Sequence, residues 1–107
     1  MKSSRICILK TTVSDRSQAE DLARALLNDR LAACVNIEGP CTSFYRWEGE
    51  NVEDSEWQIQ AKTREERAQN VIDFILDRHP YDCPEILVLD VDHAYEEYEN
   101  WVQSEVH

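Results

Sequence analysis

The chain has 107 residues, of which 42% are hydrophobic and 31% charged, and its formal net charge is −11 at pH 7. This length and composition are typical of one globular domain and exclude an intrinsically disordered chain. The acidic balance argues against nucleic acid or an anionic membrane as a partner, because phosphate groups are recognised by clustered Lys and Arg. No run is long and apolar enough to predict a membrane-spanning segment.

The first elements predicted are a strand and a helix. Residues 6–12 are apolar and β-branched, which predicts a buried strand. Ser14 or Ser17 is the expected N-cap of the following helix, and Arg30 lies near its expected end. One apolar stripe runs along that helix, formed by Ala19, Leu22, Ala23 and Leu26.

A long hairpin is predicted next. Its first strand begins at residues 33–37, is interrupted by a bulge or bend at Gly39-Pro40, and resumes at 42–47. Residues 48–51 have turn composition. The return strand alternates, with Trp57, Ile59 and Ala61 on one face and Glu56, Gln58, Gln60 and Lys62 on the other.

The last part of the chain predicts a helix, a strand and a helix. Residues 63–66 match a capping box, and Pro80 should end the helix that follows. Residues 86–89 are all apolar, the pattern of a central strand covered on both faces. A final short helix presents an aromatic stripe for packing onto a neighbour, made of Tyr95, Tyr98 and Trp101 with Val102.

This element order predicts an α+β fold, the ferredoxin-like βαββαβ arrangement with a C-terminal helix. Right-handed crossovers would place both main helices on one face of a four-stranded antiparallel sheet. The other face is expected to expose Trp57, Ile59 and half of residues 86–89, which are too apolar to remain in water. We therefore expect a homo-oligomer.

The sequence favours binding over catalysis. It has no nucleophile elbow, no P-loop and no dinucleotide fingerprint, and its two glycines cannot form a phosphate-binding loop. We therefore predict that the protein is not an enzyme. With no secretory leader apparent, the cytoplasm is the expected location, where the four cysteines would stay reduced.

Metal ligation is suggested by His79 and Cys83, an imidazole and a thiol four residues apart with Glu85 beyond them. Such donors suit Cu, Zn and Ni. His79 at a helix end could instead cap carbonyl groups, and Cys34 could be a core residue. After Arg78 the chain has acidic residues but no Lys or Arg, which indicates either a solubilising surface or a field that concentrates cations.

Several local strings together resemble the CutA divalent-cation tolerance family, over about residues 6–102. They are Leu31-Ala-Ala-Cys-Val-Asn36, Tyr45-Arg-Trp-Glu-Gly49, Lys62-Thr63, His79-Pro-Tyr81 and Pro84-Glu85. The resemblance implies a single CutA-like domain over residues 1–107, a PII-like homotrimer with an exchanged hairpin, and tolerance of copper and other divalent cations. In some bacterial members copper is bound by a strand-end Cys and two adjacent His, where this chain has Thr11 and Arg78-His79.

Two functions therefore stand as predictions. The first is a trimeric metal-tolerance protein that binds Cu²⁺ or another divalent cation, none of them obligatory, through His79 with Cys83 or Cys34. The alternative is a PII-like signalling or interaction module with a small ligand in the clefts between subunits. The residues expected to line those clefts are Trp47, Lys62, Tyr81 and Glu85.

Overall fold

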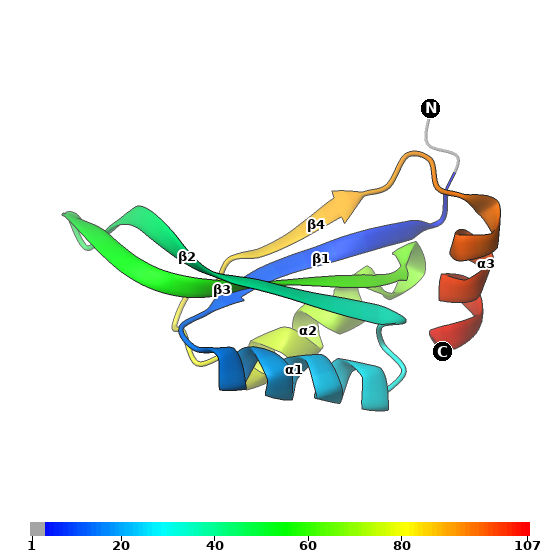
Figure 1. Cartoon of the computed structure of the whole chain (residues 1–107), viewed down its shortest axis with the longest axis horizontal. Coiled ribbons are helices and arrows are strands. Elements are labelled where there is room, and N and C mark those ends of the chain that lie inside the picture. Colours follow the sequence, from blue (N-terminus) through cyan, green and yellow to red (C-terminus); the bar gives the residue numbers. More distant parts are fainter. Residues whose placement is uncertain (1–3) are drawn as a thin grey trace.

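A computed structural model describes residues 4–107 as a four-stranded antiparallel sheet with α1 and α2 on one face and α3 at one end (Figure 1). The predicted element order is confirmed. The elements are β1 (Ile6–Val13), α1 (Arg16–Asn28), β2 (Cys34–Trp47), β3 (Glu50–Arg64), a 3₁₀ turn η1 (Glu65–Arg67), α2 (Ala68–Arg78), β4 (Ile86–Asp90) and α3 (Glu96–Glu105). The strand order is β2-β3-β1-β4. Among the described residues, no helix is both long and apolar enough to cross a membrane.

The main core lies between the sheet and the two helices. Leu9 of β1, Leu26 of α1 and Ile75 of α2 are at most 1% exposed and belong to one cluster. Alternate residues of β1 point into this layer because successive side chains of a strand face opposite sides. Burial of these apolar side chains is the main force that holds α1 and α2 against the sheet.

The predicted alternation of β3 is confirmed, but its assignment to a face was wrong. Ile59 is 1% exposed and lies in the main core, and Trp57 packs against that core. The pattern of a strand shows which side chains share a face without showing which face the helices cover. The uncovered face instead carries Gln60 and Lys62, opposite Lys10 and Ile8 of β1.

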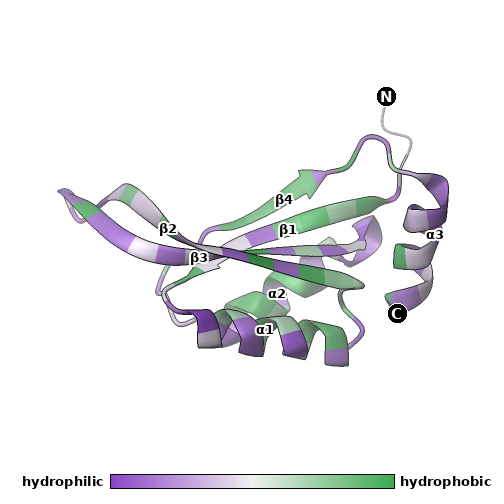
Figure 2. Cartoon of the chain, in the orientation of Figure 1, coloured by the Kyte–Doolittle hydropathy of each residue, from purple (hydrophilic) through white to green (hydrophobic). Residues whose placement is uncertain are grey.

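The prediction that residues 86–89 form a central strand was also wrong. β4 pairs only with β1 and lies at the edge of the sheet. Leu87, Val88 and Leu89 are 46%, 42% and 43% exposed. Figure 2 shows β4 as an almost unbroken apolar strand along that edge. An apolar run indicates a strand that is buried on both faces. In β4, no other part of the described chain buries Leu87, Val88 and Leu89.

Two helix starts differ from the sequence prediction. Asp15, rather than a serine, caps α1, and its carboxylate accepts the Gln18 backbone N–H at 2.9 Å. Thr63 caps no helix: it is a fully buried β3 residue whose hydroxyl donates to the Leu31 carbonyl at 2.6 Å. The 3₁₀ turn η1 precedes α2, which ends at Arg78 as the following proline predicts.

The β2–β3 hairpin extends well beyond the helix layer (Figure 1). Its register shifts between Glu38 and Cys41, which confirms the irregularity predicted at Gly39-Pro40. At the tip, Glu48 and Gly49 both have positive φ, 50° and 81°, as a two-residue type I′ turn requires. The right-handed twist of this turn lets the two strands stay paired to their ends.

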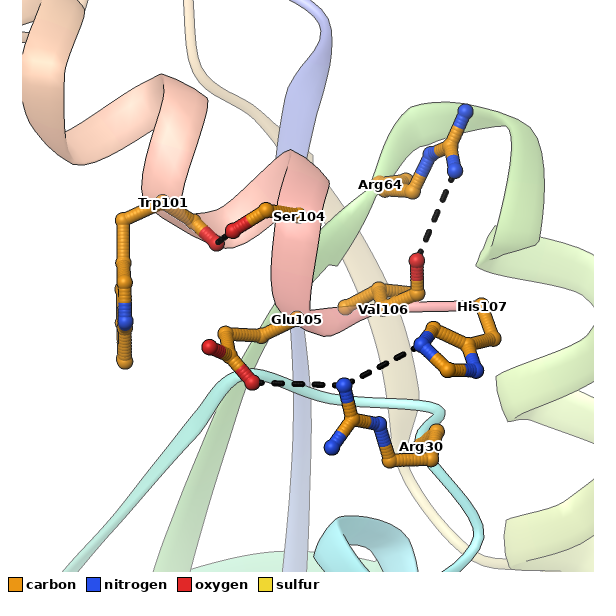
Figure 3. A network of polar contacts seen from close by, with 7 residues as sticks. All are labelled: Arg30, Arg64, Trp101, Ser104, Glu105, Val106 and His107. Atoms are coloured by element: carbon orange, nitrogen blue, oxygen red, sulfur yellow. Dashed lines mark hydrogen bonds and ion pairs between the residues drawn. The ribbon is translucent and has the colours of Figure 1, made fainter.

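The α3 helix is held by a small apolar cluster and by arginines. Val102 and Val106 are buried together with Ile6. Arg30 forms an ion pair with Glu105 at 3.3 Å, and Arg64 donates to the Val106 carbonyl at 3.4 Å. Figure 3 shows both contacts. The aromatic stripe of the same helix packs on no core within the described chain, since its members are 70%, 37% and 43% exposed: Tyr95, Tyr98 and Trp101.

Candidate functional site

A cleft of about 500 Å³ opens where the end of β1, the β2–β3 hairpin and the loop after α2 meet. Its lining combines hydroxyl, aromatic and acidic side chains with one thiol: Thr12, Ser14, Tyr45, Trp47, Asp54, Ser55, Glu56, Tyr81, Asp82, Cys83 and Glu85. Three of the four predicted cleft residues, Trp47, Tyr81 and Glu85, therefore lie around one cavity. Lys62 does not line it, and its amine is hydrogen-bonded to the Asn36 side chain.

Two tyrosine–carboxylate pairs lie in this cleft. The Tyr81 hydroxyl donates to Glu56 at 2.8 Å, and the Tyr45 hydroxyl donates to Asp54. Burial, together with the hydrogen bond to Glu56, raises the pKa of Tyr81. The hydrogen bond to Asp54 raises the pKa of Tyr45. Both phenols therefore stay protonated at neutral pH and act as hydrogen-bond donors.

The charge of the cleft is one-sided. Four carboxylates line it, and its lining includes no Lys, Arg or His: Asp54, Glu56, Asp82 and Glu85 are the acids. Glu56 is 7% exposed, so its charge is largely removed from water. A cavity walled by low-dielectric material focuses such a field. The cleft therefore attracts cations and disfavours anionic ligands.

His79 does not line the cleft, but it connects the loop after α2 to the end of β1 by hydrogen bonds. Its Nδ1 is 3.1 Å from the Tyr81 backbone N–H, which donates to it, so the proton is on Nε2. Nε2 then donates to the Thr12 carbonyl at 2.8 Å. Burial lowers the pKa of His79, which favours this neutral form. Both ring nitrogens are thus occupied, and the imidazole positions Tyr81 against the end of β1.

The two predicted thiol ligands lie apart. Cys83 is exposed and lines the cleft. Cys34 lies opposite Lys62, which pairs with Ile8, whereas His79 contacts Thr12 four residues further along β1, roughly 13 Å away at strand rise. His79 and Cys83 therefore share one loop region, and Cys34 belongs to the other end of the sheet. Within residues 4–107, no group of three or more His, Cys, Asp and Glu side chains is arranged to hold a metal ion.

The sequence interpretation missed Tyr45, Asp54 and Glu56. A partial signal was present, because Asp54 and Glu56 are two residues apart on one strand and so share a face. Their meeting with Tyr81 depends on how the loop after α2 returns to the hairpin, which no local pattern encodes.

Comparison with known proteins agrees with the fold. The family model for the CutA1 divalent ion tolerance protein matches residues 7–105. The divalent-cation tolerance protein CutA of Salmonella newport (strain SL254) is 37% identical over 97 residues, which cover 91% of this chain and 84% of that protein.

Solved structures agree as well. The divalent cation tolerance protein (Cut A1) from Thermus thermophilus has a TM-score of 0.91 and 36% identity, covering 95% of this chain and 99% of that one. CutA from Xylella fastidiosa has a TM-score of 0.94 and 32% identity, covering 97% and 100%. The chain belongs to the CutA1 divalent ion tolerance protein family.

Proposed function

We propose that this protein binds divalent cations and acts in divalent-cation tolerance, copper included. The family match over residues 7–105 carries the proposal. The net charge of −11 supports it, because a strongly negative protein raises the local concentration of cations. The family is named for tolerance and not for a reaction, in keeping with a role in binding.

His79 and Cys83, which share the loop region after α2, are our proposed metal ligands. Imidazole and thiolate are the donors that Cu and Zn prefer, and Cu²⁺ should bind most tightly among the first-row divalent ions. Coordination by His79 requires the ring to give up its bond to Tyr81 or to Thr12. Metal binding would therefore shift the loop after α2. Cys34 is a candidate donor for a separate site.

Calorimetric titration with Cu²⁺, Zn²⁺ and Ni²⁺ tests these ligands. His79→Ala and Cys83→Ser should each weaken binding at least tenfold, the scale expected when one ligand of a metal site is lost. Cys34→Ser is the matched thiol control and should leave that site unchanged. Equal affinities for wild type, His79→Ala and Cys83→Ser would remove both residues from the site.

We also propose that the protein assembles as a homotrimer in the cytoplasm. Large apolar side chains that the described chain leaves at least 37% exposed support assembly, among them Phe44, Trp47, Leu87, Leu89, Tyr95, Tyr98 and Trp101. Its four free cysteines fit a reducing compartment. The CutA of Archaeoglobus fulgidus is described as periplasmic, so cell fractionation is the test of location. A monomeric sedimentation mass at micromolar concentration would contradict the trimer.

A PII-like module that binds a small ligand in the clefts between subunits is the second candidate. It is favoured by the cavity of about 500 Å³, a volume typical of small-molecule sites. A thermal-shift screen separates the two candidates, since any ligand that binds only the folded state raises the melting temperature. Stabilisation by metabolites but not by metals would favour the module.

A further inference from the structure

We infer that His107 is a pH-sensitive switch at the C-terminal end of α3. The neutral imidazole holds this end of the helix against the rest of the chain, and the protonated imidazole releases it. All the contacts that support this inference are made within one chain, so they do not depend on which surfaces an assembly covers or on the proposed metal site.

The α3 helix is attached to the rest of the chain by few apolar side chains. Its buried members are Val102 and Val106, which cluster with Ile6 of β1. The Gln103 side chain adds a hydrogen bond to the Arg5 carbonyl at 3.0 Å. A helix on so small a cluster opens more easily than α1 and α2, which lie on the main core. Polar contacts at its C-terminal end therefore matter to its attachment.

The Arg30 guanidinium lies between the Glu105 carboxylate and the His107 ring (Figure 3). Its Nη2 atom is 3.3 Å from Glu105 and 3.1 Å from Nε2 of His107. An arginine side chain is always protonated and has no acceptor, so Arg30 donates in both contacts. Nε2 can accept only when it carries no proton, which places the proton of the ring on Nδ1. The contact is therefore specific to the neutral imidazole.

Protonation of His107 would turn this contact from attraction to repulsion. An imidazolium has a donor at each ring nitrogen, so Nε2 would direct an N–H toward the Arg30 donor and place a second positive charge beside it. Arg67, whose Nε donates to the main-chain oxygen of His107 at 2.8 Å, is another cation next to this residue. Histidine changes its charge between about pH 5 and 8. Because the attached state favours the neutral ring, attachment weakens as the pH falls through this range.

The acids near the ring are already paired with arginines. Glu105 forms its ion pair with Arg30, and Glu66 of η1 is paired with Arg64. An imidazolium would have to compete with a guanidinium for either carboxylate. The other acids on the turn after α1 and on η1 are Asp29 and Glu65.

The macrodipole of α3 acts in the opposite direction, because it favours a cation at the C-terminal end of a helix. Two guanidinium groups already contact main-chain oxygens there, since Arg64 donates to Val106 at 3.4 Å and Arg67 donates to His107 at 2.8 Å. A further cation gains little from these oxygens, whereas the ring loses its direct hydrogen bond to Arg30. The balance therefore favours release at low pH.

Hydrogen–deuterium exchange of the assembled full chain tests the switch. Backbone amides in the last turn of α3 are followed at about pH 7.5 and about pH 5.5, near the two ends of the range in which histidine titrates. The rates are corrected for the intrinsic pH dependence of exchange. We expect protection in this turn to fall about three- to tenfold at the lower pH, the scale of one lost hydrogen bond. The amide of Leu9, in the main core, should change less.

His107→Gln and His107→Lys are matched variants with opposite expectations. The amide of His107→Gln offers Arg30 a neutral acceptor at every pH, so protection should stay near the wild-type value for the higher pH in both conditions. The ammonium of His107→Lys is charged at both pH values, so protection should be low in both. His93→Gln is the control histidine variant, because His93 precedes α3 and lies at its other end. It should leave the wild-type response unchanged.

Three results would overturn the switch. They are equal protection of the last turn of α3 at the two pH values in wild type, a pH response that His107→Gln retains, and a response that His93→Gln abolishes. High protection of His107→Lys at both pH values would contradict the role of the positive charge. The metal titration of His79→Ala and the sedimentation mass are separate measurements, so failure of the switch leaves the proposed function intact.

Discussion

The two faces of the sheet differ in how completely this chain covers them. The face under α1 and α2 holds Leu9, Ile59 and Ile75, each 1% exposed. The opposite face mixes Lys62 and Gln60 with apolar residues of β4, and no helix of the described chain lies over it. The first face can stabilise the fold within one chain. The second face is suited to contacts with neighbouring subunits. The candidate cleft lies at the hairpin end of this face.

The largest expected effect is on the covered face. Leu9→Ala should lower the free energy of unfolding by about 2–5 kcal/mol, because it removes a buried side chain and leaves a cavity. Leu87→Ala, at a position 46% exposed within one chain, should cost less than Leu9→Ala, and any larger cost would come from contacts with a neighbouring subunit. Denaturant unfolding at one chain concentration measures both. Equal costs would mean that the two faces are covered equally.

The hydroxyl of Thr63 provides the next test. Thr63→Val should destabilise the protein by about 1–3 kcal/mol, because the Leu31 carbonyl loses its donor while the volume of the side chain hardly changes. The same unfolding measurement reports it. A neutral substitution would show that this hydrogen bond adds nothing to the covered face.

Thr11 is the counterpart of Thr63, because it is also buried but its hydroxyl is unpaired in residues 4–107. It is 1% exposed, and in residues 4–107 its Oγ1 has no hydrogen-bond partner. Thr11→Val should therefore be neutral or stabilise the protein by up to about 1 kcal/mol, since no bond is lost and an unpaired polar group is removed. If Thr11→Val lowered the free energy of unfolding by more than about 1 kcal/mol, as Thr63→Val should, this hydroxyl would have a hydrogen-bond partner.

The smallest effect concerns pH and the cleft. The raised pKa of Tyr81 means that the folded state keeps a phenol proton that the unfolded state loses above about pH 10. The resulting stabilisation is complete below that pH and is lost as the pH rises. Wild type should therefore lose stability more steeply than Tyr81→Phe between about pH 9 and 11. Parallel pH profiles of the unfolding free energy would contradict this role of Tyr81.

Sequence patterns predicted the local elements better than their surroundings. The alternation around Ile59 and the end of α2 before Pro80 follow from local geometry. The face that Ile59 occupies and the edge position of β4 depend on which strands pair, and a period of two or a short apolar run is the same in both cases. The apolar pattern of β4 also includes surface that no other part of residues 4–107 covers.

Part of the candidate site was predictable from the family resemblance, not from local sequence patterns. Trp47, Tyr81 and Glu85 belong to strings shared with a known family, so their meeting in one cleft could be expected. Lys62 belongs to such a string too, yet it points to Asn36 at the other end of the sheet. Glu56 looks like any polar residue of an alternating strand, and only the tertiary contact with Tyr81 makes it distinctive.

The close approach of the Trp57 ring to Gly39 makes the direction of the outer hairpin sensitive to the residue at position 39. A Cβ atom there would lie 2.9 Å from the Trp57 ring, so a larger residue must push the outer hairpin away from its base. Trp47 is eight residues further out, roughly 26 Å along an extended strand, so a change of direction of about 10° at Gly39 would displace Trp47 by about 5 Å. The shape of the cleft therefore depends partly on Gly39, a residue that does not line it.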